Sequence, residues 1–312
     1  MTRTVMKLFD LSGKTALVTG GSRGLGLQMA QALGEAGARV MLSSRNAEDL
    51  KESVATLRAA GVDCDWIAAD CSKEGDIRAL ADETIRRLGH VDILLNNAGA
   101  AWGAPAEDHP VDAWDKVMNL NVRGYFILSQ HIAKHSMIPR KSGRIINLAS
   151  IAGLGGNPAG MNTLAYNTSK GAVINFTRAL ACEWGKYNIT VNAICPGFFP
   201  SRMSAVTLKT MGEALVGHSP LGRLGDDEDL KGLCVLYASD AGKHITGQWL
   251  AVDGGMSVIT GGLFLCALAL KFLSSICSVF SSHILKTANL RSPTARGPSI
   301  KTRLVWRTAA RS

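Results

Sequence analysis

A tyrosine and a lysine stand four residues apart in the segment Tyr166-Asn167-Thr168-Ser169-Lys170. In a helix this spacing places both side chains on one face. Free tyrosine titrates near ~10, too high for a base at neutral pH, and a neighbouring ammonium lowers that pKa by favouring the phenolate. Tyr166 would then donate a proton to a carbonyl oxygen or accept one from an alcohol. A tyrosine–lysine pair at this spacing also occurs by chance on helix surfaces, which is the alternative.

A serine, Ser150, follows the apolar run Arg144–Ala149, which is typical of a buried strand. The strand precedes the helix that carries Tyr166, and both can meet at the carboxyl edge of a parallel sheet. We expect the Ser150 hydroxyl to hydrogen-bond the same substrate oxygen and to hold it in line.

A glycine-rich segment, Thr19-Gly20-Gly21-Ser22-Arg23-Gly24-Leu25-Gly26, joins the first apolar run to the first amphipathic stretch. Such a loop directs backbone N–H groups and the positive end of a helix at a phosphate, and its glycines let a pyrophosphate approach the main chain. The spacing is Gly-x3-Gly-x-Gly, not the commoner GxGxxG. We expect a dinucleotide site here; a turn that only relieves steric crowding is the alternative.

The end of the second apolar run bears on the choice of dinucleotide. It reads Ser43-Ser44-Arg45, without an acid before Glu48. An acid there would bind the ribose hydroxyls of NAD, whereas Arg45 and Arg23 suit a 2′-phosphate. The sequence therefore favours NADP(H) over NAD(H), with two solvated surface arginines as the alternative reading.

Two further turns follow predicted strands. Asp70 could accept a hydrogen bond from the adenine amino group, beside Cys71 in the same cofactor contact, or could merely belong to a helix cap, for which Ser72 is equally suited. The segment Asn96-Asn97-Ala98-Gly99 ends the next apolar run and on its own reads as an ordinary turn.

These residues need a scaffold, and the chain alternates short apolar runs with amphipathic stretches. The predicted strands are Thr15–Thr19, Arg39–Ser43, Asp63–Ala68, Ile93–Asn96, Arg144–Ala149, Thr190–Cys195 and Trp249–Val252. The predicted helices are Leu25–Ala36, Ala47–Ala60, Ser72–Leu88, Val111–Met137 and Tyr166–Tyr187. The alternation predicts a doubly wound, Rossmann-like α/β domain over residues 8–257, a parallel sheet between two helical layers, with irregular segments at 98–110, 151–165 and 197–225.

The motifs occur together and in a fixed order, and over residues 8–257 the chain resembles the short-chain dehydrogenase/reductase family in its compact single-domain form. The motifs are TGGSRGLG (19–26), Asp70, NNAG (96–99), Asn121, Ser150, YNTSK (166–170) and Pro196-Gly197. Each is modest alone, but their ordered coincidence is specific.

The resemblance implies a role for each matching residue. Tyr166 would be the acid/base, Ser150 would orient the substrate oxygen, and Lys170 would bind the nicotinamide ribose and depress the tyrosine pKa. Asn121 would help to hold a water of a proton relay. Asn97 would line the adenosine-ribose side, and the segment Pro196–Phe199, with Pro196, Gly197 and Phe199 as contacts, would line the nicotinamide side.

The chain departs from the family pattern in two places. Ser150 and Tyr166 are about three residues further apart than is common in the family, with several glycines between them. We interpret this as a longer loop that shapes the pocket, or as a tolerated surface insertion. The chain also continues for about fifty residues beyond Val252-Asp253-Gly254-Gly255, where members usually end.

Composition excludes several classes of protein. The formal net charge is +9, but residues 263–312 hold eight of the 34 Lys and Arg and none of the 25 acids, so the rest of the chain is nearly neutral, which argues against nucleic-acid binding. The seven cysteines form no CxxC pair, which favours reduced thiols in a cytosol-like compartment. The histidines, including His131 and His135 at a four-residue spacing, are interpreted as surface residues, and no metal site is expected.

The C-terminal extension, residues 263–312, begins with the mostly apolar segment Leu263–Phe280. Its length reaches the lower limit of a membrane span, but Lys271 near its centre costs ~2.5–3.5 kcal/mol. We expect a disordered or non-native extension of a cytoplasmic enzyme, with membrane association through 263–280 or an interfacial helix as alternatives. No secretory signal is expected, because too few residues precede the first apolar run.

The functional hypothesis is an NADP(H)-dependent carbonyl reductase or alcohol dehydrogenase. Its small-molecule substrate would be a sugar acid, as for gluconate 5-dehydrogenase, or a 3-oxoacyl thioester; Phe198, Phe199, Met203, Met211 and Leu215 would form an apolar lid or simply pack a short helix. The alternative from another class is a catalytically idle dinucleotide-binding module. From the family, we also expect a homodimer or homotetramer.

Overall fold

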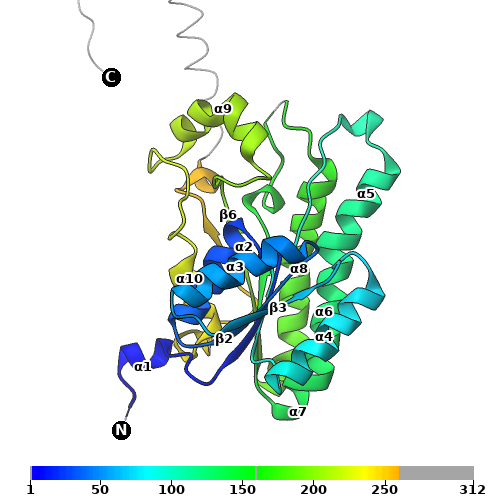
Figure 1. Ribbon diagram of the computed structural model, residues 1–312. Coiled ribbons are helices and arrows are strands. Elements are labelled where there is room, and N and C mark those ends of the chain that lie inside the picture. Colours follow the sequence, from blue (N-terminus) through cyan, green and yellow to red (C-terminus); the bar gives the residue numbers. More distant parts are fainter. Residues whose placement is uncertain (1, 159, 260–312) are drawn as a thin grey trace, which may run out of the picture. The chain divides into compact units, whose positions relative to one another are not determined.

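The computed structural model describes residues 2–158 and 160–259, and their strands form one parallel sheet (Figure 1). The seven strands lie in the order β3-β2-β1-β4-β5-β6-β7. Their bounds are β1 Thr15–Thr19, β2 Arg39–Ser44, β3 Cys64–Ala68, β4 Ile93–Asn96, β5 Gly143–Leu148, β6 Ile189–Pro196 and β7 Trp249–Val252. The order reverses between β1 and β4, and in such sheets ligands bind at this point, at the carboxyl ends of the strands.

Helices connect the strands. The α-helices are α1 Val5–Phe9, α2 Gly24–Glu35, α3 Ala47–Ala59, α4 Glu74–Leu88, α5 Val111–Met118, α6 Gly124–Ile132, α7 Ile138–Arg140, α8 Leu164–Trp184, α9 Ala205–His218 and α10 Lys231–Ala238. The π-helical turns are η2 Asn119–Arg123 and η3 Ala133–Met137. The 3₁₀ turns are η1 Ala106–Asp108, η4 Ile151–Gly153, η5 Gly185–Tyr187, η6 Asp240–Gly242 and η7 Met256–Val258.

The sheet lies between two helical layers, because successive side chains of each strand point to opposite faces. In β1, Ala16 and Val18 pack in one apolar cluster with residues of α2, α3 and α10, whereas Leu17 packs in another with residues of α4, α6 and the end of α8. Figure 1 shows the two groups of helices on either side of the sheet. The predicted three-layer, doubly wound fold is confirmed.

Most predicted elements agree with the structure within a few residues, and the differences have physical causes. The helix expected over Val111–Met137 is a helical run from Val111 to Arg140 that contains two π-helical turns. The segment 197–225, expected to be irregular, contains α9. Leu215 is the one fully buried residue of α9, so the helix lacks the continuous apolar face that sequence periodicity detects. The helices α1 and α10 were also not predicted.

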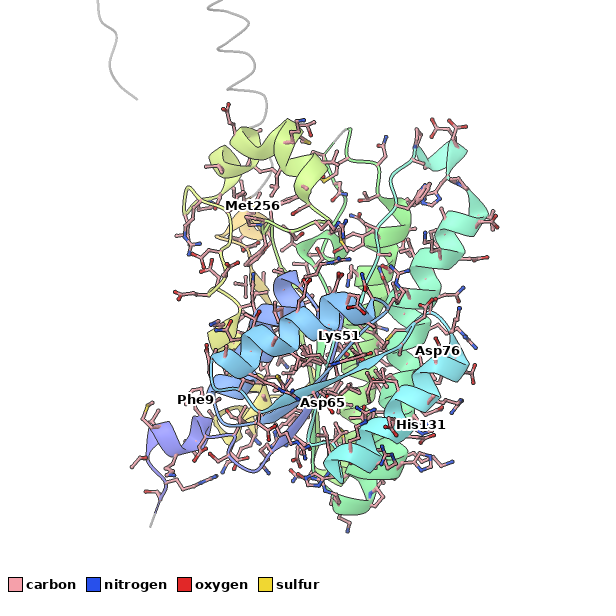
Figure 2. All side chains as sticks on the ribbon, viewed as in Figure 1. Phe9, Lys51, Asp65, Asp76, His131 and Met256 are labelled. Carbon is pink, nitrogen blue, oxygen red and sulfur yellow. The ribbon has the colours of Figure 1, made fainter. Side chains whose placement is uncertain are left out.

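The expectation that the histidines lie on the surface is wrong for one residue. His131 is buried, and its Nε2 lies 2.6 Å from the Asp82 carboxylate. In Figure 2 its label lies in the lower half of the view, far from Met256 and α9. Within the described residues, no cluster of three or more potential metal ligands occurs.

The extension 263–312, with its candidate membrane segment, lies outside the described residues. Among the helices of residues 2–158 and 160–259, none is both long and apolar enough to cross a membrane.

The amino-terminal edge of the sheet is held by a buried aspartate. Asp92, just before β4, is 5% exposed; its carboxylate accepts from Thr15 N at 3.0 Å and from the Arg140 guanidinium, and lies 3.1 Å from His90 Nε2. Burial alone would raise the pKa of Asp92, but the hydrogen bond from Thr15 and the neighbouring positive charges outweigh burial and lower it. This cluster joins β1, β4 and α7 at the edge of the sheet opposite the carboxyl ends of the strands.

Replacing the charge of this cluster should destabilise the fold in a pH-dependent way. We expect Asp92→Asn to lower the free energy of unfolding by roughly 2 kcal/mol at pH 7, since a buried hydrogen-bonded ion pair is broken. Because the folded-state pKa is depressed, the stabilisation is present above the unfolded pKa of about 3.9 and is lost as the pH falls through the folded value. Urea unfolding of wild type and variant at pH 7 and pH 3 measures this, with Asp63→Asn, an exposed partner of Arg39, as the control. An equal difference at both pH values would contradict the assignment.

Candidate active site

The tyrosine and lysine of the sequence motif lie one turn apart at the start of α8, and the structure brings them together. The Lys170 Nζ atom lies 5.6 Å from the centroid of the Tyr166 ring and 5.7 Å from that of Tyr125. Lys170 is 3% exposed, and its ammonium donates a 2.6 Å hydrogen bond to Leu148 O at the end of β5. The helix therefore presents both side chains to the carboxyl edge of the sheet.

The surroundings of Lys170 make its charge costly. Burial lowers its pKa from 10.5 to about 8 because the charged form loses its hydration, an effect that the nearby Cys195 thiol opposes. Gly99 approaches from the loop after β4: a Cβ atom there would lie 3.7 Å from Lys170 Nζ and 3.3 Å from Asn121 Oδ1. A Cβ at this position would therefore press on the Asn121 amide oxygen and make only an ordinary contact with the ammonium.

Ser150 occupies the position that the sequence predicts. It precedes η4, where its Oγ accepts from Ala152 N at 3.1 Å, and its side chain is hydrogen-bonded to Tyr166. The serine, the phenol and the ammonium of Lys170 thus form one group at the ends of β5 and α8.

The direction of the Tyr166 pKa corrects the sequence-based expectation. Burial raises the pKa of the phenol above its ordinary value of 10, and the hydrogen bond with Ser150 counteracts burial only in part. The predicted lowering by Lys170 does not outweigh burial. In this structure the phenol is a proton donor at neutral pH, which matches the requirement for protonating a carbonyl oxygen.

Asn121 lies in the π-helical turn η2 and is fully buried. Its amide Nδ2 donates to Ala100 O and to Ser169 Oγ, both at 2.9 Å, while its Oδ1 accepts from Ala100 N at 2.8 Å. Both amide N–H groups are therefore used within the protein. The side chain thus joins the loop after β4 to α8, a role that the sequence did not suggest.

Ser169 is a second residue that sequence reasoning missed. Its hydroxyl accepts from Asn121 and donates at 2.8 Å to the carbonyl oxygen of Tyr166. The only sequence signal was its place inside YNTSK, next to Lys170.

The glycine loop is shaped by close approaches of backbone and side chain. Gly20 and Gly24 have φ of +64° and +54°, a region that disfavours other residues. The Asn97 amide Nδ2 donates to Thr19 O at 2.8 Å and to Gly20 O at 3.0 Å. A Cβ atom on Gly26 would collide with the same amide and with Gly20 O. Asn97 therefore fastens the loop.

The other predicted cofactor-binding residues differ in whether they already have partners within the protein. Arg23 Nη1 is paired with Asp49 Oδ2 at 2.9 Å, and the Ser22 carbonyl accepts from Ser53 Oγ at 2.6 Å. Leu25 packs partly against the core. Arg45 is exposed and forms no hydrogen bond or ion pair with any of the described residues. Its guanidinium is therefore available to a ligand.

Asp70 and Cys71 follow β3. Asp70 Oδ1 accepts from Ser72 N at 3.1 Å and from Ser72 Oγ at 2.8 Å, as in a cap. Burial would raise the Asp70 pKa, but these hydrogen bonds and the charge of Arg45 lower it. Cys71 is buried, which raises its pKa to about 12 and leaves it a neutral thiol.

In the segment after β6, backbone contacts dominate, because the side chains of Pro196 and Phe199 are buried. Gly197 N donates to Val252 O at 2.9 Å, and a Cβ on Gly197 would lie 2.7 Å from Asp253 Cβ. Phe199 is 4% exposed and its ring packs in the core against Gly225, which agrees with the packing alternative and not with an apolar lid. Buried Pro196 ends β6.

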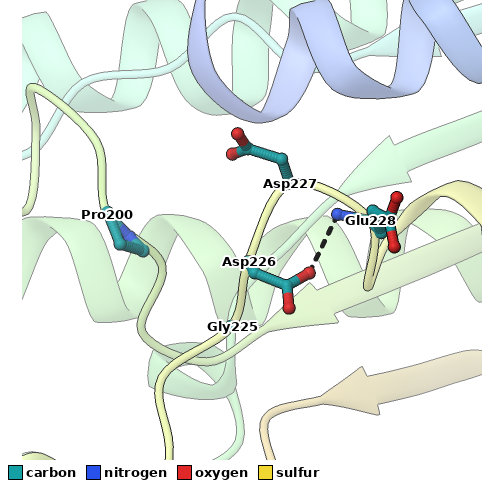
Figure 3. Close-up of a pocket in the computed structure, with 5 residues that line it drawn as sticks. All are labelled: Pro200, Gly225, Asp226, Asp227 and Glu228. Atoms are coloured by element: carbon teal, nitrogen blue, oxygen red, sulfur yellow. Dashed lines mark hydrogen bonds between the residues drawn. The ribbon is translucent and has the colours of Figure 1, made fainter.

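A pocket of about 420 Å³ lies beside the segment that follows β6 (Figure 3). It is lined by Pro200, Gly225, Asp226, Asp227 and Glu228.

A dinucleotide fits the residues around the glycine loop. The helix α2 begins after Arg23, and no side chain caps it. Its first backbone N–H groups therefore donate no hydrogen bond to a capping side chain. The turn that Asn97 holds leaves no room for Cβ atoms on Gly20 and Gly26. The N-terminus of such a helix is suited to bind a phosphate.

Comparisons with known proteins agree with this geometry. The model of the family described as "Enoyl-(Acyl carrier protein) reductase" matches residues 20–257. The chain is 42% identical over 253 residues to the rhamnolipids biosynthesis 3-oxoacyl-[acyl-carrier-protein] reductase of Pseudomonas aeruginosa, covering 79% of this chain and 97% of that protein. It is 37% identical over 253 residues to the gluconate 5-dehydrogenase of Gluconobacter oxydans, covering 80% and 97%.

A solved structure extends the comparison. The gluconate 5-dehydrogenase of Burkholderia cenocepacia, in complex with NADP and tartrate, superposes with a TM-score of 0.78 at 34% identity, covering 82% of this chain and all of that one. Sequence, topology and the order of the site residues lead to one conclusion: the chain belongs to the short-chain dehydrogenase/reductase family of oxidoreductases.

Proposed function

We propose that the chain is an NADP(H)-dependent oxidoreductase that interconverts a carbonyl and a secondary alcohol. The observation that carries the proposal is the buried Lys170 ammonium, 5.6 Å from the ring of Tyr166, whose side chain is hydrogen-bonded to Ser150. A buried cation beside a phenol stabilises the phenolate that remains after proton donation.

The site residues divide the work of proton transfer. When bound, the nicotinamide supplies or accepts the hydride. Tyr166 donates its proton to the carbonyl oxygen, or takes the hydroxyl proton of an alcohol. Ser150 hydrogen-bonds the same oxygen and orients it. Lys170 supports the charge that develops on the tyrosine oxygen, and Asn121 and Ser169 hold the first turns of α8 in place.

The proposed preference for NADP(H) has two supports. The solved relative from Burkholderia cenocepacia is a complex with NADP. In this chain β2 ends in Ser44 and Arg45 without an acid, and Arg45 is exposed and unpaired among the described residues. A guanidinium suits the 2′-phosphate because it forms forked, charge-assisted hydrogen bonds.

The sequence leaves two candidate classes of substrate, and a separate observation supports each of them. The relatives from Gluconobacter and Burkholderia are named gluconate 5-dehydrogenases, which favours a sugar acid. A 3-oxoacyl thioester is favoured by the name of the Pseudomonas relative and by α9, where the partly buried Leu208 and Met211 lie on the same helix side as buried Leu215. The reaction at the carbonyl is the same for both.

Removing the proton donor tests the proposal. We expect Tyr166→Phe to lower kcat ~10²–10⁴-fold, because proton transfer to the carbonyl oxygen is lost. NADPH binding, followed by fluorescence titration, should stay unchanged. The assay follows NADPH oxidation with 5-ketogluconate and with 3-oxoacyl thioesters of several lengths, and Tyr187→Phe, whose ring lies 5.1 Å from Lys186 Nζ, is the matched control.

The outcomes separate the hypotheses. The substrate with the higher kcat/KM fixes the class. Tight binding of NADPH by the wild type, with no turnover of any compound, would instead identify an idle dinucleotide-binding module.

The pH dependence of kcat should follow the loss of the proton from Lys170. The pKa of Lys170 is lowered to about 8 by burial, whereas that of Tyr166 is raised, so the ammonium is the first of the two to lose its proton as pH rises. We expect kcat for reduction to fall with a midpoint near pH ~8, because the phenolate loses its supporting charge. Lys170→Arg should be slower but lack this decline, since arginine stays protonated.

The measurement is kcat between pH 6 and 10 at saturating substrates. Lys186→Arg, which also changes a lysine beside a tyrosine ring, should keep the wild-type profile. A decline of Lys170→Arg at the wild-type pH would show that another group is titrating.

The cofactor preference should depend on Arg45. We expect Arg45→Ala to raise KM for NADPH about 10–100-fold, which corresponds to the loss of charge-assisted hydrogen bonds to a phosphate. KM for NADH should hardly change. The exposed Arg39 at the opposite end of β2 provides the control, Arg39→Ala. Equal changes for both cofactors would assign Arg45 a structural role instead.

A further inference from the structure

The loop between Ser150 and α8 is held by a set of polar side chains. The Asn157 amide Nδ2 donates to Thr163 Oγ1 at 2.7 Å, to Asn167 Oδ1 at 3.0 Å and to Met161 O at 3.2 Å. The Thr163 hydroxyl donates to Asn167 Oδ1 at 2.8 Å, and the Asn167 amide donates to Gly155 O at 3.2 Å. Asn157, Thr163 and Asn167 are called the latch residues below.

The latch compensates for a backbone that would otherwise be free. The loop contains Gly155, Gly156 and Gly160, the last with φ of +88°, and among its described residues regular structure is limited to η4. Glycines lose the most conformational freedom on ordering, so such a loop needs specific contacts to adopt one shape. Each latch residue supplies a side-chain hydrogen bond in place of a secondary-structure bond.

The latch is attached to the catalytic turn. Asn167 directly follows Tyr166 in α8, and its backbone N–H donates to Thr163 O at 3.0 Å. The other side of the loop is bonded to the segment after β4, where Ala104 N donates to Asn162 O at 2.9 Å. The loop thus runs from Ser150 to the start of α8, just before Tyr166, and contacts the irregular segment that follows β4.

We propose that the hydrogen bonds of Asn157, Thr163 and Asn167 fix this loop as a preformed wall of the substrate pocket, which makes the latch residues positioning residues for substrate selection. The role in substrate selection rests on the proposed oxidoreductase function, whereas the hydrogen bonds of the latch residues do not depend on it. A preformed wall lowers the ordering cost of binding for a substrate that extends past the reacting carbonyl. A compact ketone, which ends near the carbonyl, gains little from it.

The test uses the full chain and two variants that cut the same network. Asn157→Ala removes the amide, and Thr163→Val removes the hydroxyl at nearly constant shape. The loss of two or three hydrogen bonds should raise KM for the extended substrate roughly tenfold. For kcat and for KM of NADPH we expect changes of less than about twofold, and the same for KM of ethyl acetoacetate as the compact ketone. The extended substrate is 5-ketogluconate or the 3-oxoacyl thioester, whichever the wild type prefers.

Two controls define a specific effect. Thr163→Ser keeps the hydroxyl and should behave as wild type. Asn175→Ala removes an exposed asparagine of the same helix, α8, and should leave every parameter unchanged. Equal losses with compact and extended substrates, or unchanged KM in both latch variants, would overturn the proposal.

Hydrogen exchange of the unliganded protein gives a readout that is independent of turnover. Amide exchange of peptides covering residues 154–165 and 100–106 should accelerate in Asn157→Ala and Thr163→Val, while the strands keep wild-type rates. Unchanged exchange, or acceleration over the whole chain, would overturn the latch. If the wild type turns over no compound, the proposed function fails, and exchange still decides whether the loop is latched.

Discussion

A buried positive charge without a carboxylate partner is the constraint on which the site depends. Lys170 forms no ion pair with any described residue, and its ammonium is compensated by the Leu148 carbonyl and by the faces of two tyrosine rings. A carbonyl dipole and ring quadrupoles stabilise a cation less than a carboxylate does, so the pKa stays lowered at about 8. The charge therefore remains available to a group that becomes negative beside it, and Tyr166 is that group.

This arrangement requires that α8 cannot rotate on the sheet. Apolar packing alone tolerates small rotations, whereas buried hydrogen bonds specify one orientation. Asn147 on β5 supplies such a bond, since its Nδ2 donates to Thr177 Oγ1 on α8 at 2.9 Å. Its Oδ1 accepts at 2.9 Å from Asn96 Nδ2, which also donates to Ser129 Oγ on α6 at 3.0 Å. The sheet thus fixes both helices that contribute to the site, and with them the direction of Lys170.

The strands and the catalytic group could be predicted from the sequence, because both depend on local patterns. Continuous apolar runs mark strands buried on two faces, and the spacing of Tyr166 and Lys170 directly gives one helical face. The π-helical turn around Asn121 could not be predicted, since it inserts a residue into a helix whose apolar period looks regular. The helix α9 was missed because only Leu215 is buried in it, so its sequence shows no continuous apolar face.

The pKa of Tyr166 shows why residue types alone do not settle electrostatics. From the sequence, the neighbouring ammonium is expected to favour the phenolate, and this electrostatic effect depends on how close the two groups lie. Burial acts in the opposite direction, and its size depends on the packing of α8, β5 and η4 around the ring. In the folded chain burial prevails, so the phenol keeps its proton at neutral pH. A protonated phenol beside a cation is suited to donating to a carbonyl oxygen, because the proton leaves only when the substrate oxygen gains electrons. The same pair then returns to its starting state by taking a proton from solvent.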